Sequence, residues 1–135
     1  MEKTNEHIII VCVGTNVNHQ SNIAKARKIL DSTFADCRFS RVMQTLPIGM
    51  DNSNVRFANM LVAFKSTLDT EEVVSTLKRI EALCGDTHTA RRRGEIVMDI
   101  DMLKYDEERF HQSDWQRHYV KTLMEEMLQL QLTNV

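Results

Sequence analysis

Apolar residues recur along the chain with two different periods, and these periods predict the order of strands and helices. Residues 7–14 are almost continuously apolar and rich in β-branched side chains, which is typical of a buried central strand. Residues 55–67 and 96–103 alternate between two faces, as strands do. A weaker strand is expected over residues 37–45. The sequence therefore predicts a sheet of four strands.

Three other segments have the period of an amphipathic helix. The first follows Ser21, a candidate N-cap, and its apolar positions are Ile23, Ala26, Leu30 and Phe34. The second follows Asp69 or Thr70 and ends near Gly85, and its stripe is Val74, Leu77, Ile80 and Cys84. A last helix is expected from about Asp114, with an apolar stripe at Val120, Leu123, Met127 and Leu130.

This order of elements favours one α+β domain over residues 1–135. The pattern predicts a ferredoxin-like β-α-β-β-α-β sandwich, in which two helices cover one face of an antiparallel sheet and a C-terminal helix is added. The opposite face of the sheet is expected to stay partly open. A functional site would then lie on that face.

Charge and cysteine content narrow the classes of function. The net charge of −2 and the pI of about 6.2 argue against nucleic-acid and membrane-surface partners. The three cysteines have neither a disulfide nor a zinc spacing, which suggests reduced thiols. The polar start is unlike a signal peptide, and no stretch has the length of a membrane span. We therefore expect a cytoplasmic protein.

Asp99 and Asp101 are the strongest candidates for functional residues. At positions i and i+2 of a strand, their side chains share a face and lie about 7 Å apart at the backbone. Mg²⁺ is a natural partner, because it takes one or two carboxylates together with substrate phosphates, and two such ions can bridge a transferring phosphoryl group. The alternative is a solvent-exposed strand face that carries two solvated aspartates.

Phe57 and Asn59 share a face of another predicted strand. An aromatic ring and an amide so placed can stack on a flat heterocycle and hydrogen-bond to it. The alternative is an ordinary exposed residue beside a satisfied amide.

The arginine run 91–93, followed by Gly94, suits phosphate groups, because the guanidinium geometry matches theirs. A mobile basic loop that closes over a polyphosphate would also exclude water from a transfer reaction. The alternative is a solvated charge run in a loop.

Five short segments occur in a fixed order between residues 8 and 104. They are Val13-Gly14-Thr15-Asn16, Thr45-Leu46-Pro47-Ile48-Gly49, Phe57-Ala58-Asn59, Arg79-Ile80-Glu81 with Gly85, and Gly94 with Met98-Asp99-Ile100-Asp101-Met102-Leu103. In order and spacing they resemble the motifs of the 6-hydroxymethyl-7,8-dihydropterin pyrophosphokinases. The resemblance implies transfer of pyrophosphate from ATP, the co-substrate, to the pterin hydroxymethyl group in folate biosynthesis, with AMP as the other product.

The resemblance also implies roles for individual residues. Two Mg²⁺ ions would be held by Asp99 and Asp101. The pterin would be bound by Thr45, Leu46, Ile48, Phe57 and Asn59. The nucleotide would lie near Glu81, Arg91, Arg93 and His118, and Arg92 would act at the transferred group. ATP and the pterin would be the partners, and a monomer or a weak homodimer is expected.

The sequence departs from the family in the loop before Asp99 and Asp101, which we call the acidic pair. Asp86, Arg93 and Ile96 stand where the family carries an arginine, a tryptophan and a second arginine, and toward the C-terminus only His118-Tyr119 resembles the family's His-Tyr. Two alternatives therefore stay open beside an active enzyme. One is a domain of the same fold that binds a nucleotide or a pterin without catalysis, or acts on another substrate. The other is an RNA-binding module, which the acidic open face disfavours.

Overall fold

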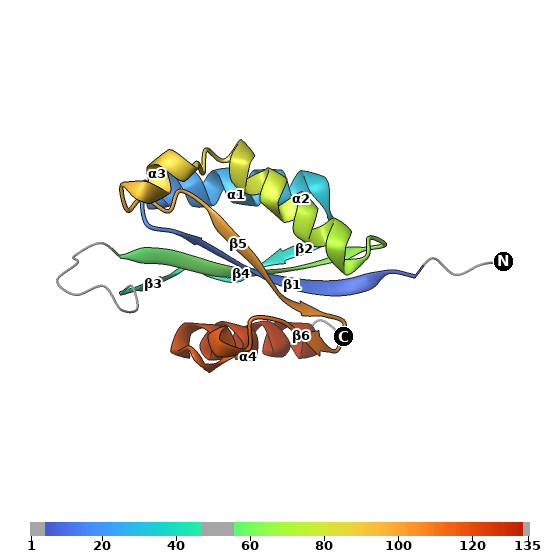
Figure 1. Ribbon diagram of the computed structural model, residues 1–135. Helices are drawn as coiled ribbons and strands as arrows, with labels where there is room; N and C mark the ends of the chain where they lie inside the picture. Colours follow the sequence, from blue (N-terminus) through green and yellow to red (C-terminus); the bar gives the residue numbers. More distant parts are fainter. Residues whose placement is uncertain (1–4, 47–55, 134–135) are drawn as a thin grey trace.

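The computed structural model describes residues 5–46 and 56–133, apart from the side chains from residue 130 onward (Figure 1). The described strands form a six-stranded antiparallel sheet in the order β2-β4-β1-β5-β6, and β3 also pairs with β4. The strands are β1 (His7–Thr15), β2 (Ala35–Phe39), β3 (Met43–Thr45), β4 (Phe57–Ser66), β5 (Asp99–Tyr105) and β6 (Glu108–Arg109).

Helices lie on both sides of this sheet (Figure 1). On one face are α1 (His19–Thr33), α2 (Thr70–Leu83) and the short α3 (His88–Arg92), and on the other are the 3₁₀ helix η1 (Gln112–Gln116) and α4 (His118–Thr133). The predicted ferredoxin-like sandwich with a C-terminal helix is confirmed. None of the described helices has the length and apolar character needed to cross a membrane.

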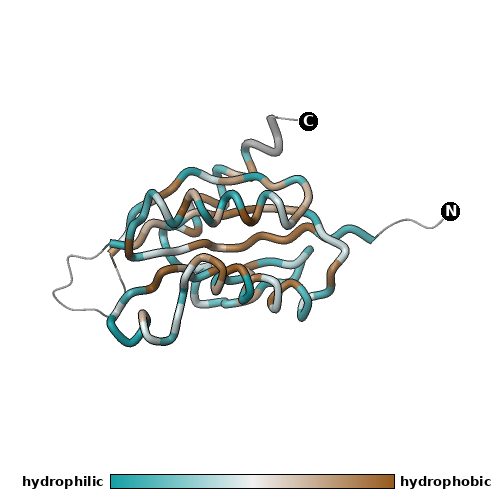
Figure 2. The backbone as a smooth tube through the Cα atoms, turned by 90° about the horizontal axis from the view of Figure 1, so that it is seen from above, coloured by the Kyte–Doolittle hydropathy of each residue, from teal (hydrophilic) through white to brown (hydrophobic). Residues whose placement is uncertain are grey.

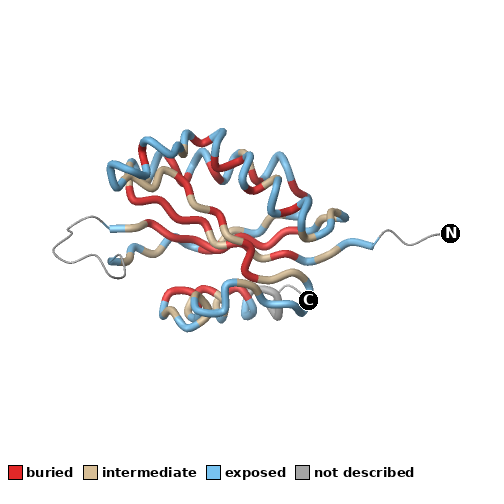
Figure 3. Tube along the Cα trace, in the orientation of Figure 1, coloured by how far each residue is buried: buried red, intermediate tan, exposed pale blue. Residues whose placement is uncertain are grey.

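The alternating strand residues divide the interior into two cores, one on each face of the sheet. The larger core, under α1 and α2, contains Ile9, Val11, Val13, Ala58, Met60, Val62, Phe64, Leu30, Leu77 and Ile80. The smaller core joins Leu61, Ala63 and Leu103 of the sheet to Tyr119, Val120, Leu123 and Met127 of α4. Buried and apolar residues therefore follow the central strands in both views (Figures 2 and 3). The second face is open only where α4 does not cover it.

The first helix begins earlier than predicted. It starts at His19, because Asn18 adopts a left-handed backbone conformation (φ 44°) and ends the preceding turn. The Asn22 side chain then donates a hydrogen bond of 2.7 Å to the Val17 carbonyl. Ser21 is thus an exposed residue of the first turn and is not the cap.

Three further expectations need correction. The segment predicted as one strand over residues 37–45 is two strands, because Ser40 turns inward and its Oγ accepts a hydrogen bond of 2.8 Å from the Leu61 amide. The predicted loop 86–95 contains α3, which Thr87 caps and which buries only Ala90. In α2, Val73 is fully buried and Val74 is 41% exposed, because the Asp69 capping box sets the start of the helix.

Candidate active site

One row of the sheet joins the acidic pair to the candidate heterocycle site. The strand register places Asp99 opposite Gly14, Gly14 opposite Asn59, and Asn59 opposite Met43. A Cβ atom at Gly14 would lie only 3.2 Å from Asn59 Oδ1. The absence of a side chain at Gly14 therefore keeps the space between Asn59 and Asp99 clear on this face.

Asn59 is held by its neighbours at the end of this row. Its Nδ2 donates hydrogen bonds of 2.8 Å to Thr45 Oγ1 and of 3.4 Å to the Met43 carbonyl, and the residue is buried. Phe57 is half-buried and pairs with Thr45 across the strands. Three of the predicted pterin-binding residues therefore lie together. Leu46 follows as an exposed side chain, and Ile48 lies outside the described residues.

The next row carries Asp101 and connects it to α4. Asp101 lies opposite Cys12. The Cys12 Sγ is 3.5 Å from the hydroxyl of Tyr119, a buried residue in the first turn of α4. Burial raises the pKa of the Cys12 thiol to about 12. Cys12 is therefore a neutral packing and hydrogen-bonding group here, since only a thiolate is a strong nucleophile.

The two carboxylates of the acidic pair are only partly neutralised by protein groups. Arg91 Nη2 lies 3.6 Å from Asp99 Oδ1, and His111 Nε2 lies 4.0 Å from Asp101 Oδ1. The side chains of Asp99 and Asp101 are 40% and 30% exposed. Burial and the neighbouring Asp99 charge together raise the pKa of Asp101 to about 6. An added cation would relieve this repulsion.

Hard oxygen donors of this kind suit Mg²⁺. Within residues 5–46 and 56–133, no group of three or more His, Cys, Asp and Glu side chains is arranged to hold a metal ion. Two carboxylates are nevertheless enough for Mg²⁺, which keeps several waters and takes further oxygens from substrate phosphates. Asp99 and Asp101 therefore fit the ion that the sequence predicts, as long as a phosphorylated substrate supplies the rest of its ligands.

Arg91 is fixed beside Asp99 by its own hydrogen bonds. Its Nε donates to Asp86 Oδ2 at 2.7 Å, and its Nη2 donates to the Met98 carbonyl at 3.3 Å. The Asp86 side chain is 9% exposed, and its Oδ1 accepts a hydrogen bond of 3.2 Å from the Met98 amide. Asp86 therefore positions both the arginine and the residue that precedes Asp99.

The three arginines of the run do not act as one group. Of the three, Arg91 is the one that forms an ion pair with the acidic pair. Arg93 forms an ion pair of 3.2 Å with Glu95. Arg92 is exposed, and no ion pair joins it to any residue that the structure describes. Their neighbourhood in the sequence did not distinguish them, because α3 turns successive side chains in different directions.

Glu81 and His118 occupy different environments. Glu81 is buried, its Oε2 accepts a hydrogen bond of 2.7 Å from the Ile100 amide, and burial raises its pKa. It therefore holds the backbone of β5 between the two aspartates. His118 is exposed at the start of α4, and its Nε2 is 3.5 Å from Thr122 Oγ1.

Sequence reasoning missed Asp86, His111 and Cys12 as neighbours of the acidic pair. Asp86 and His111 lie in irregular segments where no period signals a contact, and His111 has a left-handed backbone (φ 54°). Cys12 was hidden in an apolar strand, and only the register with β5 reveals its position beside Asp101.

Comparison with known proteins places this arrangement in context. The sequence model of the family described as 7,8-dihydro-6-hydroxymethylpterin-pyrophosphokinase matches residues 10–129. The chain is also 25% identical over 138 residues to a folate synthesis bifunctional protein of Arabidopsis thaliana. That alignment covers 95% of this chain and 28% of the plant protein, so the chain spans less than a third of this relative.

Proposed function

Because the chain belongs to the 7,8-dihydro-6-hydroxymethylpterin-pyrophosphokinase family, we propose that it transfers pyrophosphate from ATP to 6-hydroxymethyl-7,8-dihydropterin. In this reaction the pterin hydroxyl oxygen forms a bond to the β-phosphorus of ATP and loses its proton. The bond between the β-phosphorus and the α,β-bridging oxygen breaks, and AMP leaves with that oxygen. The product would serve folate biosynthesis. A cytoplasmic location and a monomer or weak homodimer stay predictions.

The observation that carries the proposal is the row Asp99–Gly14–Asn59 across three strands. It puts a candidate cation site and a candidate heterocycle site on one face, with a glycine between them. Asn59 would hydrogen-bond to the pterin and Phe57 would stack on it, while Thr45 fixes the Asn59 amide. Leu46 and Ile48 are proposed to bind the pterin as well. Such an arrangement favours transfer by positioning the two substrates.

In this proposal Asp99 and Asp101 would hold two Mg²⁺ ions together with the phosphates of ATP. Bound Mg²⁺ supplies neutralisation of phosphate charge, which is the main requirement of phosphoryl-type transfer. The chain contributes the positions of its carboxylates, because Glu81 and Asp86 accept hydrogen bonds from the amides of Ile100 and Met98 on either side of Asp99. Positioned charge of this kind needs no rearrangement during the reaction.

The arginines have separate proposed roles. Arg91, held against Asp99, would contact the nucleotide phosphates and would stand in for an arginine that the family carries elsewhere in this loop. Arg92, exposed on α3, would act at the transferred group. Arg93 and His118, both near the surface, are proposed for the nucleotide, and Glu81 would support the same side through β5.

The test is AMP formation by the purified chain with Mg²⁺, ATP and the hydroxymethyl pterin. We expect turnover, and we expect Asp99→Asn and Asp101→Asn to lower it by about 10²-fold or more, because each removes a charged group that supports the transferring phosphates. Asp31→Asn, an exposed aspartate on α1, is the matched control and should leave turnover unchanged. If no AMP forms where a reference family member turns over, catalysis is excluded.

A second candidate is a domain that binds nucleotide or pterin without catalysis. The ion pair between Asp86 and Arg91 favours it, because the carboxylate offsets a positive charge that the phosphates would otherwise use. Calorimetry with a non-hydrolysable ATP analogue separates the two candidates when turnover fails. Binding that needs Mg²⁺ and is lost with a chelator supports the binding domain, whereas no binding at all rejects both.

A further inference from the structure

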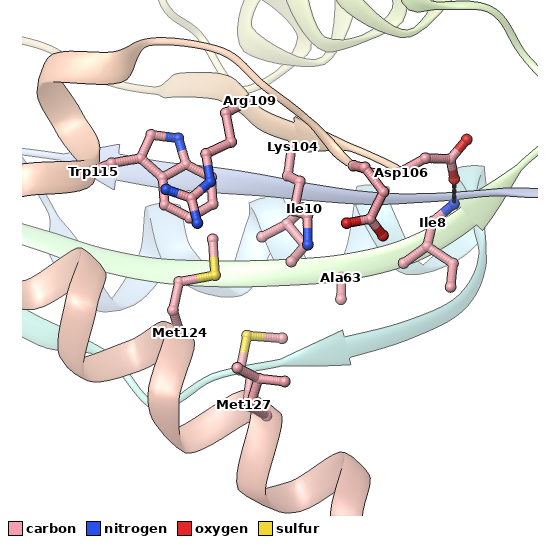
Figure 4. A pocket seen from close by; sticks show the side chains of 11 residues that line it. Ile8, Ile10, Ala63, Lys104, Asp106, Arg109, Trp115, Met124 and Met127 are labelled. Carbon is pink, nitrogen blue, oxygen red and sulfur yellow. Dashed lines mark hydrogen bonds between the residues drawn. The ribbon is translucent and has the colours of Figure 1, made fainter.

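A groove of about 430 Å³ lies between the sheet and α4, toward the start of β1 (Figure 4), and neither Asp99 nor Asp101 lines it. Its floor is formed by Ile10 and Ala63, and Trp115 and Met124 form part of its wall. A volume of this size falls within the range of small-molecule sites, roughly 300–1,000 Å³. No residue of this groove takes part in the proposed reaction.

Two large apolar side chains at the groove remain exposed to water. Ile8 is 49% exposed and Leu128 is 59% exposed, and they come from the sheet and from α4 respectively. A bound molecule with an apolar body would cover both side chains, and the removal of their apolar surface from water would favour binding. The groove therefore offers surface that a ligand can bury.

An irregularity in β5 sends a lysine into the groove. Ile10 pairs with Lys104, but Val11 pairs with Met102, so Leu103 is an extra residue in the strand. As a result Leu103 is buried under α4 and the next residue, Lys104, also lines the α4 side. Bulges of this kind redirect side chains and are frequent beside functional sites. Lys104 is half-buried and forms no ion pair with any residue of the described chain.

The other charged groups of the groove are placed differently. Arg109 stacks on the Trp115 ring, 4.1 Å from its centroid, and the indole Nε1 donates a hydrogen bond of 3.0 Å to the Phe110 carbonyl. The Asp106 carboxylate is already engaged by His7 at 2.6 Å and by the Ile8 amide at 2.9 Å. Glu107 is exposed at the rim. Of the charged residues that line the groove, Lys104 is half-buried and the others are exposed.

We propose that this groove is a second ligand site, which takes a small aromatic anion with one carboxylate or sulfonate group. The anionic group would pair with Lys104, since a cation among apolar side chains gains most from a desolvated partner. The rings would lie against Trp115 and Met124, because methionine sulfur makes favourable contacts with aromatic rings and adapts to their shape. The proposal is independent of the pyrophosphokinase activity.

The chain supplies its own reporter, because Trp115 is its only tryptophan and forms a wall of the groove. The probes are 1-anilinonaphthalene-8-sulfonate and its uncharged analogue N-phenyl-1-naphthylamine, titrated into the full chain while the tryptophan emission is followed. The sulfonate is expected to quench Trp115 saturably and to bind about tenfold more tightly than the neutral probe. Equal affinity of the two probes, or no quenching, overturns the proposal.

Three variants locate the charge that is responsible. Lys104→Met keeps the length of the side chain and should weaken sulfonate binding about tenfold without changing the neutral probe. Glu107→Gln removes a rim carboxylate and should tighten sulfonate binding, so the two variants have opposite signs. Lys28→Met, at an exposed position of α1, is the matched control. If Lys104→Met binds like the parent, or if sedimentation shows a dimer that excludes the probe, the site is not the proposed one.

Discussion

Arg91 lies with its Nη2 atom 3.6 Å from the Asp99 carboxylate. The contact is imposed by Asp86, which binds the Arg91 Nε at 2.7 Å and the Met98 amide at 3.2 Å. A loop that lacks the arginines expected from the family resemblance therefore still presents a guanidinium beside the acidic pair. The same carboxylate that places this guanidinium also offsets its positive charge.

The first prediction concerns this pair. Arg91→Lys should lower kcat/KM for ATP about tenfold, because lysine cannot bind Asp86 and the Met98 carbonyl in the same planar geometry. Asp86→Asn should lower it as well, since the arginine loses its charged anchor. Steady-state kinetics measure both variants, with Arg38→Lys on β2 as an exposed control. Unchanged kinetics in both would mean that Arg91 serves only the fold.

The second prediction tests the hydrogen bond between Glu81 and the Ile100 amide. Glu81→Ala should lower the free energy of unfolding by roughly 1–3 kcal/mol, because it leaves a buried amide without an acceptor. Glu81→Gln keeps an acceptor and should cost clearly less. Urea unfolding measures both variants. A larger loss in the glutamine variant would contradict this assignment.

The third prediction follows from the pKa of Asp101, which burial and Asp99 raise to about 6. The folded state then binds this proton more tightly than the unfolded state, so stability should fall as the pH rises from about 4 to about 6. Asp101→Asn should remove that part of the pH dependence.

Mg²⁺ selects the ionised carboxylate, so added Mg²⁺ should stabilise the protein more at about pH 7 than at about pH 5. Urea midpoints across this range test each point.

The fourth prediction concerns the space that the missing side chain of Gly14 leaves beside Asn59. In Gly14→Ala the new methyl group would meet Asn59 Oδ1 at 3.2 Å and push the amide away from Thr45. Pterin affinity should therefore fall. In an Asn59→Ala background the same change should cost little further, since the contact is gone. Calorimetry of the four proteins gives the coupling, and simple additivity would contradict a direct contact.

The fifth prediction tests whether α4 is part of the folded core. Leu123→Ala should lower the free energy of unfolding by about 2–5 kcal/mol, because Leu123 is fully buried against the second face of the sheet. Leu128→Ala on the same helix, 59% exposed, should change it little. Equal effects of the two changes would mean that α4 does not pack as described.

The fold was largely predictable because most of its signals are local. The alternation over β4 correctly separates Met60 and Val62 from Leu61 and Ala63, which pack in different cores. The alternation predicted over residues 96–103 likewise puts Asp99 and Asp101 on the face opposite Met98 and Ile100. The resemblance to known motifs added a function that the periods alone do not specify.

The missed features depend on contacts between distant segments. Asn18 ends a turn through a left-handed backbone conformation, and Ser40 interrupts an edge strand by bonding to Leu61, so neither is visible as a period. In α2 the neighbouring valines 73 and 74 both fit a helical stripe, and only packing selects Val73. The partners of Arg91 were equally hidden, because Asp86 approaches it across the start of α3.

The extra residue in β5 has a consequence for changes in chain length. Without Leu103, Met102 and Lys104 would become neighbours and the strand would alternate regularly, so both aspartates and Tyr105 would keep their present sides. Loss of this leucine would reduce the contact between β5 and α4, and Asp99 and Asp101 would stay on their present face of the sheet.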